Sequence, residues 1–575
     1  MLAVAAAVVL MFSVASRPEA LRSETAADAF DGAGAAALAR EIVRLAPERE
    51  PGGEGDEAAA DLVARRFGAI AGGEVLEQRF SGSFDGDEVE MRNVTMTLPG
   101  SVAGRIVIAA PRDCAEGPCA VSSAAATAAL LELAATFDGT RHRKTLLFAS
   151  LDGSAAGAAG ARELAEALEA EPAEAVIVIS QPAAETLERP LVVPWSSGPQ
   201  STSIQLVESA KQAVETELPG EGTLRLGTLQ SLARLAVPAG LGEQAPLIEA
   251  GVDAIALSSA GERPLPPSAD TAADLSADSL TGVGRAALSL TLALDVYDED
   301  LEHGPEAYVP LAGKLIPGWA LALLALSLLV PVGLVSVDAL ARCARQREPV
   351  VAASAWALSR ASPFAAAVLL AYALALVDLV PAPESPFDPR RFTLDLGAVV
   401  AMLALLAAVV ATLRLVRMLP PPEHADWALP ASIGVLLFVS SLGVWLANPY
   451  LGLLLVPTAH LWLLASLLRG RLPAALALLA AGLVIPFAVL VSLGVFLGSG
   501  ISTPWELLLM FTGRHFGPLA AVPLCLLGGC LVAVLANAAG PSPLPRGSGE
   551  ARVRGPLTYA GPGSLGGTES ALPRR

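Results

Sequence analysis

The sequence has few of the residues on which hydrolytic metal sites depend. Five of its 575 residues are histidines, and His142 and His303 are the two that precede residue 311, where long apolar stretches begin. His142 lies in the charged turn TRHRK, and neither histidine directly follows a predicted strand. A hydrolytic zinc site needs three or more histidine or carboxylate ligands per ion and an open position for water. The scarcity of histidine therefore argues against an ordinary hydrolytic zinc site.

Positive charge is scarce as well. The chain has 38 lysines and arginines against 57 aspartates and glutamates, which gives a formal net charge of −19. Proteins that bind nucleic acid present basic surfaces to the phosphate backbone. The charge balance therefore excludes nucleic acid as an expected partner. The acidic residues lie mainly before residue 311, which fits a domain exposed to water.

Apolar residues are abundant but unevenly distributed. They make up 53% of the chain, and they are concentrated at the start and after Leu311. A chain of this length is too long for one hydrophobic core. We therefore expect an N-terminal anchor at 1–16, a soluble domain at 17–308, a membrane domain at 309–540 and a disordered tail at 541–575.

The predicted membrane domain contains seven long apolar stretches, each long enough to cross a bilayer of about 30 Å. They are centred near Leu326, Leu370, Leu405, Leu437, Leu455, Val484 and Leu526. We expect about seven transmembrane helices, with residues 351–360 as an interfacial lead-in to the second. The lipid bilayer is thus the first predicted partner.

The loops between these stretches predict the orientation in the membrane. DALARCARQR, RLVRM, RGR and the C-terminal tail are basic, and they fall on alternate loops. Because basic loops stay in the cytoplasm, the soluble domain is expected outside it and the tail inside. The Arg-rich, Lys-poor and Ala-rich usage suggests a high-GC bacterium, so the plasma membrane is the expected location.

The apolar run from Leu2 to Ser16 is shorter than the roughly 20 residues that a membrane span needs. A cleaved signal peptide and a signal anchor both fit it, and both place the next domain outside the cytoplasm. We favour the anchor, because Arg17 directly after the run is a poor context for cleavage.

The soluble domain is organised around residues 104–168. An apolar run at 105–110 is followed by a loop, an Ala/Leu helix at 122–136, a second apolar run at 145–150 and another helix. This alternation predicts a βαβ unit in a largely parallel sheet. Function in such sheets gathers at the carboxyl ends of the strands, here the loops 111–121 and 151–157.

These residues resemble the core of metallopeptidase family 28, the di-zinc aminopeptidases. TAALLELA (Thr127–Ala134) and FASLDGSAAGAAGA (Phe148–Ala161) are similar to the family's helix and second strand-turn. RNVTMTLPG, which precedes them, resembles an earlier strand of the family, and AVIVISQP, RPLVVPWSSGPQS, GVDAIALSS and PPSADT resemble later segments in the same order. The resemblance covers about the first half of the chain. It implies an α/β zinc-aminopeptidase-like domain with a mixed, largely parallel sheet flanked by helices, followed here by an all-α polytopic transmembrane domain.

The same resemblance implies that the catalytic chemistry has been lost. The family's metal ligands and general base align with residues that cannot replace them, namely Pro111, Ser122, Ser154, Ala155, Ser180 and Pro266. We therefore expect no catalytic residue, no bound metal and no cofactor, zinc included. The positions that support the metal ligands in the family keep Asp113, Asp152 and Asp270.

A few carboxylates could still gather near the strand ends. They are Asp113, Asp152, Glu243, Asp253 and Asp270. We expect Asp113 and Asp152 to hold loops through backbone hydrogen bonds. In the family an Arg-x-x-Gly pattern precedes the second helix, and Arg49 and Gly52 match it.

Two cysteines in one loop, Cys114 and Cys119 of DCAEGPC, are candidates for a disulfide, because an oxidising compartment is expected on this side of the membrane. A metal site is the weaker alternative, since no second Cys or His pair completes it. Two unpaired residues are the third alternative.

One ionisable residue, His460, lies in the middle of a predicted span. Such residues are functional candidates by default. A neutral imidazole bonded to a neighbouring helix is the competing interpretation, and we favour it.

The whole plan also resembles two eukaryotic groups, the endoplasmic reticulum metallopeptidases and the peptidase-like subunit of the glycosylphosphatidylinositol transamidase. We expect a non-catalytic, peptidase-like membrane protein that acts in binding or assembly, with a membrane protein, a peptide or a lipid-linked molecule in its cleft. The alternatives are an active membrane zinc aminopeptidase and a transporter-like protein with an accessory domain.

Overall fold

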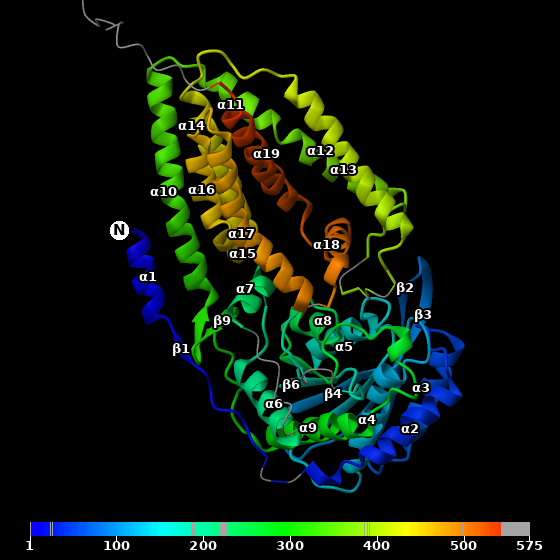
Figure 1. The fold of residues 1–575 in the computed structure, drawn as a ribbon. Coiled ribbons are helices and arrows are strands. Elements are labelled where there is room, and N and C mark those ends of the chain that lie inside the picture. The colour runs from blue at the N-terminus through cyan, green and yellow to red at the C-terminus, as the bar shows by residue number, and fades with distance from the viewer. Residues whose placement is uncertain are drawn as a thin grey trace, which may run out of the picture.

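A computed structural model describes residues 2–541, except 24, 26, 186–190, 199, 219–226, 384–385, 388, 390 and 497. The predicted tail at 541–575 and the first residues of the RPLVVPWSSGPQS segment thus lie largely outside the described residues. Figure 1 shows two parts, an α/β half built on a sheet and a bundle of long helices beside it.

The main sheet has seven strands in the order β2-β3-β5-β4-β6-β8-β7. The central strands β5, β4, β6 and β8 run parallel, whereas β2, β3 and β7 run antiparallel to their neighbours. The bounds are β2 (Glu74–Phe84), β3 (Asp87–Leu98), β4 (Arg105–Pro111), β5 (Thr145–Leu151), β6 (Ala175–Ile179), β7 (Leu191–Val193) and β8 (Ala254–Ser258). The predicted fold class is therefore confirmed.

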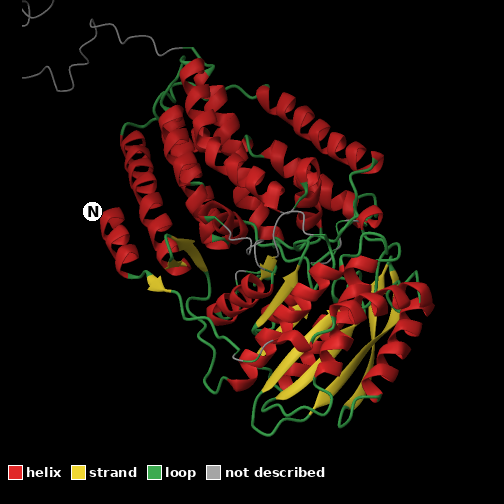
Figure 2. Cartoon of the chain, turned by 60° about the horizontal axis from the view of Figure 1, so that its bottom comes forward, coloured by secondary structure: helices red, strands yellow, loops and turns green. Residues whose placement is uncertain are grey.

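Both faces of the sheet are covered by helices, as Figure 2 shows. Ile106 and Ile108 of β4 pack into one apolar core, and Val107 and Ala109, which point the other way, pack into a second. Parallel strands buried on both faces read as continuous apolar runs, which is what made β4 visible in the sequence. The covering helices are α2 (Gly32–Leu45), α3 (Glu54–Gly68), α4 (Ala125–Thr136), α6 (Ile204–Glu217) and α9 (Ala277–Val296) on one face, and α5 (Ala159–Ala170) and α8 (Gln244–Glu249) on the other.

A small antiparallel sheet joins the α/β half to the first long helix. Its order is β1-β10-β9, and its strands are β1 (Ala15–Ser16), β9 (Tyr308–Leu311) and β10 (Lys314–Pro317). Pro317 caps α10 (Gly318–Arg345), and α1 (Leu2–Phe12) packs along α10. The residues after α1 are thereby fixed to the base of the helical half.

Six helices among the described residues are long and apolar enough to cross a membrane, which makes the chain a multi-pass membrane protein. They are α10, the continuous pair α11 (Val350–Ser359) and α12 (Ser362–Leu376), α13 (Leu396–Arg417), α14 (Ala428–Ala447), α17 (Leu472–Phe496) and α19 (Ala521–Ala538). Residues 351–360 are thus part of the second candidate span rather than a separate lead-in.

The predicted seventh span, near Leu455, is divided into two helices that are each too short to cross a bilayer. These are α15 (Pro449–Leu454) and α16 (Val456–Ser466). Asn448 ends α14 and caps α15, and Pro457 lies in the first turn of α16, where its missing N–H costs nothing. Six unbroken helices among the described residues are therefore candidate spans, and the predicted seventh span, divided here between α15 and α16, stays a prediction.

Polar contacts fasten the two halves together. Arg263 of the α/β half pairs with Glu506 of α18 (Thr503–Thr512) at 2.8 Å, and His515 Nε2 lies 2.6 Å from the carbonyl oxygen of Pro238. Asn448 donates to the last carbonyls of α7 (Thr228–Ala236), at 2.8 Å from that of Leu235. The edge of the sheet that carries the strand carboxyl ends thus lies against the helical half.

Candidate functional site

A cavity of about 60 Å³ lies at the carboxyl ends of the parallel strands. Its lining includes Pro111, Ser122, Ser154 and Ser180, four of the six positions that the sequence resemblance singled out, together with Asp113. Topology explains this convergence, because β4, β5 and β6 run parallel and all end at the same edge.

The other two singled-out positions lie outside this lining. Ala155 is buried directly after Ser154, and its backbone N–H bonds to Asp113. Pro266 precedes the short 3-10 turn at Pro267–Ala269. Pro264, two residues earlier, lines the cavity instead.

The donor set around the cavity does not fit a pair of zinc ions. Proline offers no ligand, and neutral serine hydroxyls are poor substitutes for imidazole and carboxylate. The hydroxyls are also engaged, since Ser122 Oγ donates to Asp270 and Ser154 Oγ donates to Glu243. No cluster of three or more His, Cys, Asp or Glu side chains suited to a metal occurs among the described residues.

Asp113 joins the two loops that border the cavity. Its carboxylate oxygens accept the backbone N–H groups of Ser154 at 2.8 Å and of Ala155 at 2.9 Å. Asp113 is buried, and burial raises the pKa of its carboxyl group well above the usual range. The loop-holding backbone bonds predicted for Asp113 are therefore present.

Asp152 and Asp270 also bond to the backbone. Asp152 accepts the N–H groups of Arg92 at 2.9 Å and Gly153 at 2.7 Å. Asp270 accepts those of Val121 at 2.8 Å and Ser122 at 3.0 Å, at the start of the segment that leads into α4. These carboxylates hold the rim of the cavity in place.

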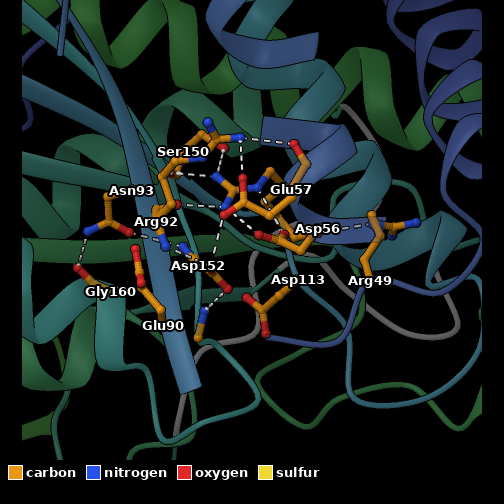
Figure 3. A network of polar contacts seen from close by, with 12 residues as sticks. Arg49, Asp56, Glu57, Glu90, Arg92, Asn93, Asp113, Ser150, Asp152 and Gly160 are labelled. Carbon is orange, nitrogen blue, oxygen red and sulfur yellow. Dashed lines mark hydrogen bonds and ion pairs between the residues drawn. The ribbon is translucent and has the colours of Figure 1, made fainter. Parts of the chain in front are cut away.

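A buried charge network under the cavity was not predicted from the sequence. Arg112 is fully buried, and its Nε donates to Asp56 Oδ1 at 2.9 Å while Nη2 also contacts Asp56. Nη2 lies 3.6 Å from Asp152 and 2.7 Å from the carbonyl oxygen of Arg92. Figure 3 shows Asp56, Asp152 and Arg92 within this network of polar contacts. The available signal was an arginine directly after an apolar strand, in the sequence APRD.

Arg49 is equally buried, and its side chain holds the same region in place through hydrogen bonds. Its guanidinium donates to the carbonyls of Arg112 at 3.1 Å, Ala46 at 2.7 Å and Pro118 at 3.0 Å, and to Ser123 Oγ at 3.0 Å. Arg49 is the arginine of the Arg-x-x-Gly match in the sequence, and its side chain satisfies carbonyl groups of the surrounding loops.

Burial changes the protonation of this network. It raises the pKa of Asp56 to about 7, against the opposing pull of Arg112, and lowers that of Arg49 to about 10. For Arg112 the facing carboxylates Asp56 and Asp152 outweigh burial, so its pKa rises above the usual value. Arg112 is therefore a permanent cation at the centre of buried acids.

Cys114 and Cys119 form a disulfide in the loop beside the cavity, with their Cα atoms 6.1 Å apart. Cys114 N donates to the Arg49 carbonyl at 2.6 Å, and Gly117 adopts a φ of 82° that suits glycine. The loop that carries metal-site residues in the resembling family is thus covalently closed here.

The helical half reaches the same cavity rim. Arg391, in the connection between α12 and α13, donates to the carbonyl of Ala155 at 3.1 Å and pairs with Asp85. Its guanidinium lies 4.2 Å from the centre of the Phe84 ring. The loop at 153–157 is therefore held from both halves of the molecule.

A second cavity, of about 130 Å³, lies where the α/β half meets the base of α10. Trp195 and Arg234 line it, and both contact Glu262, which lines the first cavity. Arg234 stacks 3.8 Å from the Trp195 ring centre. This charged wall separates the two cavities.

The polar candidate in the membrane half, His460, lies in the short helix α16. Its Nδ1 is 2.9 Å from the carbonyl oxygen of Val456, four residues earlier in the same helix. The expected bond to a neighbouring helix is therefore replaced by a bond within α16, because the ring folds back along its own turn.

Comparison with known proteins gives structural likeness only. No protein-family model and no curated protein matches the chain. Similar solved structures include the glutaminyl cyclase of an Acidobacteriales bacterium, with 19% identity, 49% of this chain and 99% of that chain covered, and a TM-score of 0.38. The zinc aminopeptidase BSAP from Bacillus subtilis shares 12% identity over 48% of this chain and 98% of its own, with a TM-score of 0.38. The LapA aminopeptidase of Legionella pneumophila shares 12% identity over 49% of this chain and 78% of its own, with a TM-score of 0.41. At these values the likeness carries nothing about activity or substrate.

Proposed function

We infer that this chain is a multi-pass membrane protein whose peptidase-like domain binds a ligand or partner and does not hydrolyse peptides. The observation that carries the proposal is the set of side chains that line the cavity at the strand ends. The Ser122 and Ser154 hydroxyls and the Asp113 carboxylate are taken up by internal hydrogen bonds that hold the surrounding loops.

Hydrolysis with a zinc-bound water needs ligands for the metal and a free carboxylate to take the water's proton. Glu243 is the acidic side chain placed closest to such a role, but its carboxylate accepts the Ser154 hydroxyl and burial raises its pKa. A buried carboxylate that already accepts the Ser154 hydroxyl is poorly placed to take a proton from water.

The position of the cavity favours a ligand that comes from the membrane or from a membrane protein. Its rim is bonded to Arg391 of the helical half, and the neighbouring cavity is lined in part by Tyr308 and Leu315 of the small sheet that precedes α10. A peptide, a lipid-linked molecule or a partner subunit at this junction would contact both halves of the chain. The soluble domain and this junction are proposed to lie outside the cytoplasm, on the side opposite the basic loops.

A peptidase assay tests the proposal. Full-length protein in detergent, incubated with zinc, should hydrolyse aminoacyl-p-nitroanilides no faster than buffer with zinc does. The variant Glu243→Gln should give the same background. Hydrolysis by the wild-type chain that is lost in Glu243→Gln would support the alternative of an active zinc aminopeptidase and contradict this proposal.

A further inference from the structure

A large cavity lies at the end of the helical half farthest from the sheet. It has a volume of about 580 Å³, within the range of sites that hold organic ligands. Helices α13, α17 and α19 form its walls, and the junction of α11 and α12 closes one end. The apolar lining includes Leu413, Leu472, Leu476 and Leu535.

Three arginines from different segments line this cavity. They are Arg360 between α11 and α12, Arg417 in the last turn of α13, and Arg469 before α17. No acidic residue is found among the described lining residues. Arg469 pairs with Asp426, which stands outside the lining, so Arg360 and Arg417 leave an excess of positive charge.

The side chain of Arg360 is held in a fixed position at this end of the cavity. It is 2% exposed, and its Nη2 donates to the Leu419 carbonyl at 2.8 Å while Nη1 donates to that of Val416. The guanidinium stacks 4.1 Å from the Trp356 ring centre. Its Nε is buried and has no hydrogen-bond partner within the described part of the chain.

We propose that this cavity binds one anionic phospholipid, with the phosphate between Arg417, Arg469 and Arg360 and an acyl chain along the leucine wall. Arginine matches phosphate oxygens in charge and geometry. Basic pockets between transmembrane helices on the cytoplasmic side suit such headgroups. A free phosphate would leave the apolar wall exposed to water.

The C-terminal residues 542–575 are the competing occupant, because Gly540 and Pro541 line the cavity. That segment carries five arginines against two glutamates. Its charge has the same sign as the cavity, so electrostatics disfavours it there and favours an anion.

In the test, full-length protein is equilibrated in nanodiscs of phosphatidylglycerol and, separately, of phosphatidylcholine, and is then extracted into detergent. Native mass spectrometry measures how many lipid molecules the protein retains. The wild-type chain should retain one phosphatidylglycerol and no phosphatidylcholine. Arg417→Gln should weaken retention about fivefold, the effect of one arginine near a membrane surface. Arg414→Gln is the matched control, because Arg414 is exposed on the same helical turn and does not line the cavity.

Three results would overturn the proposal. They are equal retention of the two lipids, equal loss in Arg417→Gln and Arg414→Gln, and displacement of the lipid by millimolar inorganic phosphate. A chain ending at Pro541 should retain lipid as the wild type does. If the truncated chain retained more lipid than the wild type, the result would show that residues 542–575 occupy the cavity instead, and it would also overturn the proposal. Arg417 is used for the variant because Arg360 supports the backbone and its loss could unfold the site.

Discussion

At the scale of residues, two buried arginines determine how the candidate site is held. Arg112 and Arg49 together satisfy carbonyl groups from several loops and face the carboxylates beneath the cavity. Burying such charges is costly, and they are retained only when paired and fully hydrogen-bonded. We regard this network as the support that keeps the strand ends in place.

Replacing Arg112 with methionine should destabilise the α/β half by about 3–5 kcal/mol, because Asp56 and Asp152 would lose a buried counter-charge. For a domain of this size the melting temperature should fall by on the order of 10 °C. Thermal unfolding in detergent, followed by tryptophan fluorescence, measures it.

Arg66→Ala is the matched control for that experiment. Arg66 forms a solvent-exposed pair with Glu41 at 3.6 Å, so its loss should cost no more than about 0.5 kcal/mol. Equal destabilisation by the two variants would show that the Arg112 network does not support the fold.

Glu243 provides a prediction for pH dependence. Burial raises the pKa of Glu243 in the folded chain. The stability that this difference in pKa contributes is fully present below about 4.3, the pKa in the unfolded chain, and is lost as the pH rises through the raised pKa of the folded chain. A glutamine at this position cannot ionise and keeps an oxygen for the Ser154 hydroxyl. Glu243→Gln should therefore melt at the wild-type temperature near pH 4 and above it at pH 8. A variant that is less stable at pH 8 would contradict this assignment.

The residues around the cavity were largely predictable, whereas the network below it was not. The ligand positions followed from sequence segments in a fixed order, and parallel topology brought Pro111, Ser122, Ser154 and Ser180 together. Nothing in the local pattern could pair Arg112 with Asp56, because the two are separated by 56 positions and come from different elements.

At the scale of elements, the loop between β4 and α4 is held by both a disulfide and a buried arginine. The disulfide between Cys114 and Cys119 closes it, and Arg49 holds its carbonyls from below. Closing a short loop restricts the unfolded chain, which is the main way a disulfide stabilises a protein.

Replacing both Cys114 and Cys119 with serine should lower stability by about 2 kcal/mol, the chain-entropy estimate for a loop this short. Amide hydrogen exchange of residues 113–123 should become faster, while that of the β6 strand should not change. Unchanged exchange in the loop would mean that Arg49 alone fixes its conformation.

Element boundaries in the membrane half show where sequence patterns are insufficient. Hydropathy counted seven stretches, and six of them form candidate spans among the described residues. The stretch near Leu455 is divided between α15 and α16, because a composition average does not register Asn448, which caps α15, or Pro457 in the first turn of α16. The apolar runs at 105–110 and 145–150 match β4 and β5 to within one residue, because buried parallel strands read as continuous apolar runs.

At the scale of the whole molecule, orientation in the membrane determines what the cavity at the strand ends can meet. The basic ends of α10 and α13 lie away from the sheet in Figure 1, and the α/β half lies at the opposite end of the bundle. This arrangement supports the proposed orientation, with the α/β half outside the cytoplasm.

Cysteine labelling tests that orientation. Glu299→Cys lies on the exposed surface after α9, and Gln346→Cys lies at the exposed end of α10. A membrane-impermeant maleimide should label position 299 in intact spheroplasts and position 346 only after permeabilisation. The reverse pattern would place the α/β half in the cytoplasm.

The central claim is that the peptidase-like domain has lost its metal chemistry, and zinc content tests it most directly. Full-length protein purified in detergent would be loaded with zinc, desalted and measured by elemental mass spectrometry. We predict far less than one zinc ion per chain, since the cavity presents proline, serine hydroxyls and carboxylates that are already hydrogen-bonded. Retention of about two zinc ions per chain, as a co-catalytic site would show, would contradict the account.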